Sequence, residues 1–109
     1  MRPAGTLVLS LLVAGGCVPR LGPNIADPDP AVKIPAIKRI ADAGDMSQVP
    51  QLIDALQDPD PAVRFFAAEA LQRLTGRRHG FQADAPQEQR DEAVTRWRES
   101  LTTEPVEAQ

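Results

Sequence analysis

The chain has 109 residues and a formal net charge of −3 at neutral pH, with 42% hydrophobic but only 4% aromatic residues. This length allows one small domain, and the acidic balance excludes the broad basic surface that nucleic-acid binding requires. Because there is one cysteine, an internal disulfide and a cysteine-cluster metal site are both excluded.

The first 16 residues, MRPAGTLVLSLLVAGG, place Arg2 before an apolar run over residues 7–13. A run this short cannot cross roughly 30 Å of hydrocarbon as a mature helix, which needs about 20 residues. The pattern is typical of a secretory signal peptide. We therefore expect residues 1–16 to be removed during export.

Residues 12–17, LVAGGC, resemble the lipobox of bacterial lipoproteins. In that family the chain is cut before the cysteine, whose thiol and new amino group are then acylated. The resemblance implies that Cys17 is the first mature residue, is lipidated, and anchors the protein to a membrane of the cell envelope. The alternative is cleavage by ordinary signal peptidase after Ala14-Gly15-Gly16, which would yield a soluble periplasmic or secreted protein with a free thiol.

Residues 17–29 follow, and their proline- and glycine-containing sequence has no apolar period. Such a composition predicts a flexible tether. The folded domain is then expected over residues 30–101. Residues 102–109 contain little to bury and are expected to form a disordered tail.

An internal repeat determines the expected fold. The letters DPDPAV begin at Asp27 and again at Asp58, 31 positions later. In each copy an aspartate can cap the free amides of a helix whose first turn tolerates proline. Capping also explains these aspartates better than a calcium site does.

The first repeat predicts two antiparallel helices. Helix one is expected over 30–43, ending at Gly44, with a kink or a loose first turn caused by Pro35. Helix two is expected over 48–57 with Ser47 as its N-cap. The residues predicted to face inward are Val32, Ala36, Ile37, Ile40, Ala43, Val49, Leu52, Ile53 and Leu56.

The second repeat predicts a second antiparallel pair, with helix three over 61–74 and helix four over 86–101. An insertion, residues 75–85, separates them and offers Phe81 as its only apolar anchor, while Asp84 and Gln87 can form a capping box. We expect Phe81 and Trp97 to close the open end of the stack. The apolar stripes consist of Val63, Phe66, Ala67, Ala70, Leu71 and Leu74, widened by Phe65 and Ala68, and of Ala93, Val94, Trp97 and Leu101.

Residues 27–76 resemble two consecutive HEAT-like repeats, of the short kind also found in phycobilisome lyase subunits. The pattern V-R-x-x-A-x-x-A-L-x-x-L is carried by Val63, Arg64, Ala67, Ala70, Leu71 and Leu74. The resemblance implies an all-α fold, a short α-solenoid of two helical pairs. It also implies a binding surface more than an activity.

Candidate sites for chemistry are few. The one histidine, His79, has no second histidine or cysteine as a partner, so no catalytic residues, cofactor or metal site are expected. The basic cluster of Arg73, Arg77, Arg78 and His79 could bind phosphate, but we favour the interpretation that it complements the end of helix three and lies in solvent.

The function expected is therefore that of a membrane-tethered module that binds another protein. Recognition is predicted on the polar faces of helices two and four, which carry Gln48, Gln51, Asp54, Gln57, Glu92, Arg96 and Glu99. These side chains include no large apolar anchor, so binding should be weak unless Phe65 is also exposed. The alternatives are an accessory or lyase-like subunit of a larger complex and a secreted spacer without lipid.

Overall fold

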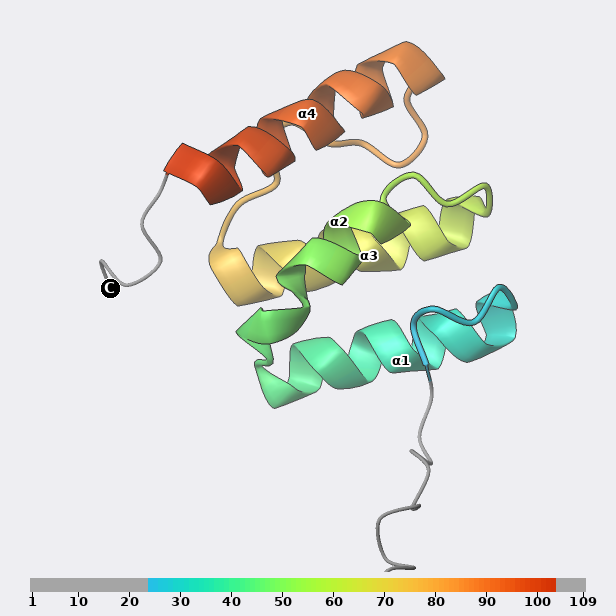
Figure 1. Cartoon of the computed structure of the whole chain (residues 1–109). Coiled ribbons are helices and arrows are strands. Elements are labelled where there is room, and N and C mark those ends of the chain that lie inside the picture. Colours follow the sequence, from blue (N-terminus) through green and yellow to red (C-terminus); the bar gives the residue numbers. More distant parts are fainter. Residues whose placement is uncertain (1–23, 104–109) are drawn as a thin grey trace, which may run out of the picture.

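The computed structural model describes residues 24–103, which form helices and connecting turns without any strand (Figure 1). The elements are α1 (Pro30–Ala43), the 3₁₀ turn η2 (Met46–Gln48), α2 (Val49–Ala55), α3 (Pro61–Thr75) and α4 (Gln87–Thr103). α1 and α3 pack side by side, and α2 packs between α3 and α4. The predicted four-helix, all-α solenoid is confirmed. The predicted signal peptide, Cys17 and residues 104–109 lie outside the described residues.

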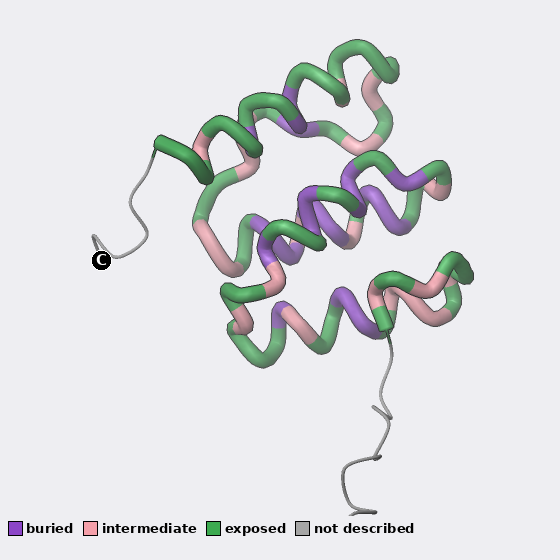
Figure 2. The backbone as a smooth tube through the Cα atoms, in the orientation of Figure 1, coloured by how far each residue is buried: buried purple, intermediate pink, exposed green. Residues whose placement is uncertain are grey.

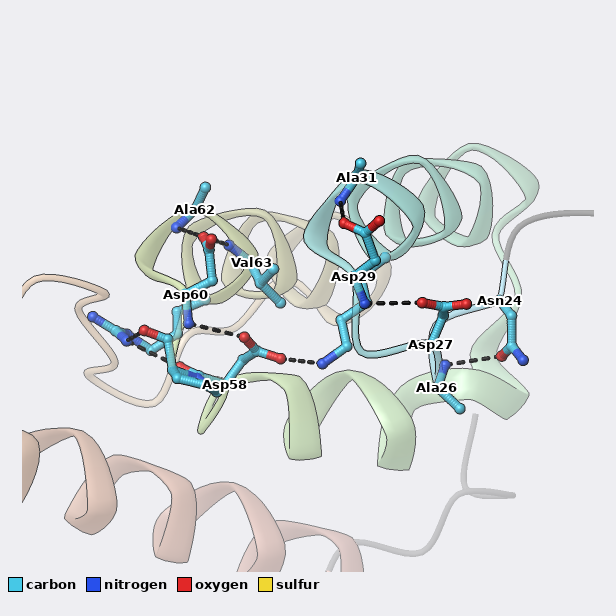
Figure 3. Close-up of polar contacts among 12 residues, drawn as sticks. Asn24, Ala26, Asp27, Asp29, Ala31, Asp58, Asp60, Ala62 and Val63 are labelled. Carbon is cyan, nitrogen blue, oxygen red and sulfur yellow. Dashed lines mark hydrogen bonds and ion pairs between the residues drawn. The ribbon is translucent and has the colours of Figure 1, made fainter.

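The two repeated segments start their helices in the same way (Figure 3). Asp29 caps α1 by accepting a hydrogen bond from the amide of Ala31, and Asp60 caps α3 by accepting from the amides of Ala62 and Val63. Each helix has proline in its first turn, where a missing amide hydrogen removes no helical bond. The predicted capping role is confirmed for Asp29 and Asp60, whereas Asp27 and Asp58 accept hydrogen bonds from the amides of these two residues.

Glycine ends both of these helices. Gly44 has φ of 66° and Gly76 has φ of 80°, the left-handed conformation that residues with a Cβ atom adopt at a cost. The amide of Gly76 donates to the carbonyl of Gln72. Both helices therefore stop where the sequence predicts, to within one residue.

The core consists mainly of aliphatic side chains from α1, α2, α3 and α4, together with Phe81 and Trp97. Figure 2 shows that the buried residues lie on the facing sides of the helices. All four predicted residues of α2 are buried, and so are most of those of α3. Two predictions of inward-facing residues are wrong. Ala43 is exposed at the last position of α1, and Leu101 is 41% exposed because α4 extends beyond the helices it packs against.

Helix two begins differently from the prediction. Ser47 is not its N-cap, because its own amide and hydroxyl both donate to the carboxylate of Asp45, which caps the 3₁₀ turn before the helix. α2 then begins at Val49 without a side-chain cap. The side-chain cap of this segment is therefore Asp45, two residues before the predicted one.

Helix four also departs from expectation. The predicted capping box is wrong, because α4 begins at Gln87 and its first turn bonds to the carbonyl of Pro86, which accepts from the amides of Gln89 and Arg90. In addition, α4 runs in the same direction as α3 (Figure 1). The predicted antiparallel pairing of these two helices is wrong because the segment after Gly76 carries the chain back along the domain before α4 starts.

Pro35 does not interrupt α1, which is one continuous helix from Pro30 to Ala43. Residues 24–29, which the sequence analysis assigns to the tether, form a turn in which the amide of Ala26 donates to the side chain of Asn24, and Ile25 packs against the core.

Candidate protein-binding surface

The largest exposed aromatic side chain lies on α3. Phe65 is 47% exposed, although its neighbour Phe66 is partly buried against the core. The two rings meet edge to face with 5.3 Å between their centroids. The Phe65 ring therefore rests against Phe66, a ring that is itself packed against the core.

A groove of about 410 Å³ runs between α1 and α3 beside Phe65. Its floor is apolar and its rims are charged, because the two helices turn small and aliphatic residues toward each other and long polar ones outward. The groove is lined by Ile37, Lys38, Ala41, Asp42, Phe65, Phe66, Glu69, Ala70 and Arg73.

A second hollow of about 410 Å³ lies on the other side of the same ring. It is formed where α3 meets the inserted segment, and it is lined by Pro61, Phe65, Arg78, Gln82, Ala83 and Asp84. Phe65 thus stands as a ridge between two largely apolar depressions. We call the groove, the ridge and the hollow together the Phe65 surface.

Most rim charges of the Phe65 surface are already paired. Arg73 bonds to Asp42 across the groove at 3.0 Å, and Arg78 bonds to Glu69 at 3.2 Å. Lys38 instead lies over the ring of Phe66, 4.7 Å from its centroid. Arg73 and Arg78 thus form ion pairs within the domain.

The polar residues predicted on α2 are distributed over several environments. Gln51 and Asp54 border a hollow near the turn that precedes α1, and Gln48 borders another beside Ile25. Asp54 and Gln57 also accept hydrogen bonds from Arg98 of α4, and Gln57 donates to Asp91. These contacts join α2 to α4 and occupy part of the predicted recognition face.

The predicted residues of α4 lie apart from those of α2. Glu92 and Arg96 border a polar hollow with the inserted segment, and the Arg96 guanidinium donates to the carbonyl of His79. Glu99 is exposed. The helix side that faces α2 instead presents Asp91 and Arg98. The structure therefore does not join all seven predicted residues into one patch.

The end of the stack is closed as predicted. Trp97 is 2% exposed and Phe81 is 1% exposed, and both belong to the core cluster. The ring of His79 packs edge to face on Trp97, with centroids 4.4 Å apart. His79 thus takes part in packing at the end of the domain.

Among the described residues there is no group of three or more His, Cys, Asp or Glu side chains arranged to hold a metal ion. Within the same residues, no helix combines the length and the apolar character needed to cross a membrane.

Sequence reasoning missed the Phe65 surface as the main candidate. Phe65 extends the apolar stripe of α3 beyond the width that one neighbouring helix can cover, and this excess was the available signal. The structure provides partners for Ala68 but leaves Phe65 open.

Comparison with known proteins agrees with this architecture. The family of HEAT repeats matches residues 18–97, which is most of the chain. No curated protein and no solved structure gives a significant match. With the repeated helix starts, the side-by-side α1 and α3, and a family match over most of its length, this chain belongs to the HEAT-repeat family.

Proposed function

We propose that this protein is a protein-interaction module held at a membrane of the bacterial cell envelope, and that the Phe65 surface is its main binding site. HEAT repeats are interaction or scaffold modules. The observation that carries the choice of surface is the half-exposed Phe65 between two apolar depressions. Interfaces concentrate their binding energy in aromatic anchors of this kind, surrounded by polar rims.

The proposed membrane attachment rests on the sequence LVAGGC at residues 12–17. Acylation of Cys17 on its thiol and its amino group would supply two or three chains, which anchor stably where a single chain is marginal. Residues between Cys17 and Asn24 would then separate the domain from the membrane surface. In the alternative, a soluble protein of the same fold would be secreted.

The polar faces of α2 and α4 form a second proposed surface. Gln51 and Asp54 border a hollow beside the turn before α1, and their side chains are exposed. They would bind through adaptable hydrogen bonds and without an aromatic anchor. We propose no catalytic role for either surface, since no nucleophile, base and orienting group are expected to come together there.

Site-specific photo-cross-linking in intact bacteria tests the binding surface. A benzophenone amino acid is placed at Phe65, at Gln51, or at Glu88, an exposed position in the first turn of α4 that serves as the control. We expect one or a few adducts of defined mass from Phe65. Equal capture from positions 65 and 88, or no capture from either, would indicate that the domain is only a spacer.

Membrane attachment is tested by the intact mass of the purified mature protein, which reports cleavage and acylation together. We expect cleavage before Cys17 and the added mass of acyl chains. Cys17→Ser should move the protein to the soluble fraction. A soluble wild-type protein with a titratable thiol would establish ordinary secretion instead.

A further inference from the structure

The Phe65 surface carries both a protruding ring and depressions that could receive such a ring. Phe65 lines the groove on one side and the hollow on the other. A surface that displays a knob and matching holes close together can pair with a second copy of itself, because a two-fold axis places each knob opposite the partner's hole. This self-matching is the first reason to consider a second copy as the occupant.

The charges of the Phe65 surface provide a second, independent reason. Among its charged residues, Lys38 and Asp84 are the two without an ion pair in the part of the chain that the structure describes. Lys38 lines only the groove, and Asp84 lines only the hollow. One unpaired cation and one unpaired anion therefore lie on opposite sides of the Phe65 ring.

We propose that the Phe65 surface is the contact between two copies of this chain, related by a two-fold axis beside Phe65. This inference rests on the proposed function, since it names the partner of the same surface. The axis brings the two rings together in the centre and places Lys38 of each copy opposite Asp84 of the other. The contact then pairs both remaining charges and covers the exposed aromatic ring.

The surface involves one groove and one hollow, so the dimer should be weak, with a Kd in roughly the micromolar range. Attachment of both copies to one membrane would raise their effective concentration.

Sedimentation equilibrium of the full chain tests the dimer, in density-matched detergent if the protein is acylated. We expect a monomer–dimer equilibrium whose Kd rises at least about tenfold in Phe65→Ala. Circular dichroism checks that each variant keeps its helices. A wild type that stays monomeric at about millimolar concentration, far above the expected micromolar Kd, would overturn the proposal.

Charge reversal provides the sharper test. Lys38→Glu and Asp84→Lys should each weaken the dimer about threefold or more, because each sets like charges opposite one another. The double variant Lys38→Glu/Asp84→Lys should return to within about threefold of wild type, since the pairs are restored in reverse. A double variant no tighter than the single ones would contradict the proposed arrangement.

The matched control uses Arg39→Glu and Glu88→Lys, alone and together. Both residues are exposed, neither lines the Phe65 surface, and the changes alter net charge by the same amounts. We expect no change in Kd beyond about twofold, because neither side chain lines the groove or the hollow and both lie in solvent, where salt screens their charges. A loss equal to that of Lys38→Glu and Asp84→Lys would show a general charge effect and overturn the pairing.

The photo-cross-linking described above separates the two proposals. An adduct from position 65 with twice the mass of the chain supports both. An adduct containing only a different protein keeps the proposed function but overturns the second copy as partner. No adduct from position 65 overturns both.

Discussion

The two repeated segments start their helices with the same letters, but the basic residue that follows these letters makes different contacts in each segment. Lys33 in α1 and Arg64 in α3 occupy the same register position. The ammonium of Lys33 bonds to the carboxylate of Asp58, at the start of the next repeat (Figure 3). Arg64 instead donates to the carbonyls of Asp58, Pro59 and Ala83.

This difference follows from what comes next in the chain. After α1, a second DPDP segment supplies Asp58 as the acceptor for Lys33. After α3 the chain continues into the inserted segment, residues 75–85, and not into a third DPDP segment. Arg64 is 8% exposed and reaches the inserted segment, which it fixes to the start of α3. The first repeat thus binds the second, whereas the second repeat binds its own inserted segment.

Removal of the Trp97 side chain, which closes the end of the second repeat, should lower the free energy of unfolding more than any other change considered below. Trp97→Ala should lower the free energy of unfolding by about 3 to 5 kcal/mol, because the ring fills the end of the core. Chemical denaturation followed by circular dichroism measures this loss. Thr95→Ala, on the exposed side of α4, is the control and should change it by less than about 0.5 kcal/mol.

The native fluorescence of Trp97 gives a separate check of its burial. Trp97 is the only tryptophan, so its emission should be blue-shifted in the folded protein and move to the red on unfolding. Emission at the solvent value in the native protein would contradict burial of the ring.

Arg64 is the next most sensitive position in the comparison. Arg64→Met keeps most of the aliphatic stem but removes the donors to three carbonyls, so we expect a loss of about 2 to 4 kcal/mol. Arg64→Lys should lose less, because an ammonium keeps the charge but not the planar fork. Thermal unfolding measures both. Equal losses in the two variants would mean that charge contributes nothing at this site.

Pro35 distinguishes α1 from α3, where Phe66 has the corresponding position. Pro35→Ala should raise stability by about 2 kcal/mol, because the restored amide can donate to the carbonyl of Ala31. The control is Pro50→Ala in the first turn of α2, which should be nearly neutral since proline there removes no helical bond. A destabilised Pro35→Ala protein in denaturant titration would show that Pro35 packs favourably.

The smallest effect compares the two N-caps. Asp60→Ala should cost about 1 kcal/mol, and Asp29→Ala somewhat less. The reason is that Asp60 accepts hydrogen bonds from two amides, and Asp29 accepts from one. Urea titration of both variants measures the difference. A larger loss for Asp29→Ala would mean that the first cap also holds the turn formed by residues 24–29.

Local chemistry explains why much of the fold could be predicted from the letters alone. Aspartate and proline set the starts of α1 and α3, and glycine sets their ends. Each of these residues lies next to the helix end that it sets. The stripe of α2 has a period that leaves one face to bury. Such signals act within a turn or two of helix, so they depend little on the rest of the molecule.

The direction of α4, the cap of η2 and the exposure of Phe65 were decided only by the tertiary structure. A glycine-rich insertion can end a helix, but which way it carries the chain depends on where Phe81 and Arg64 find buried partners. Likewise, the periodicity of α3 shows that Phe65 is apolar and adjacent to the stripe. Whether a neighbour covers it depends on how closely α1 and the inserted segment approach, and residues far apart in sequence determine that distance.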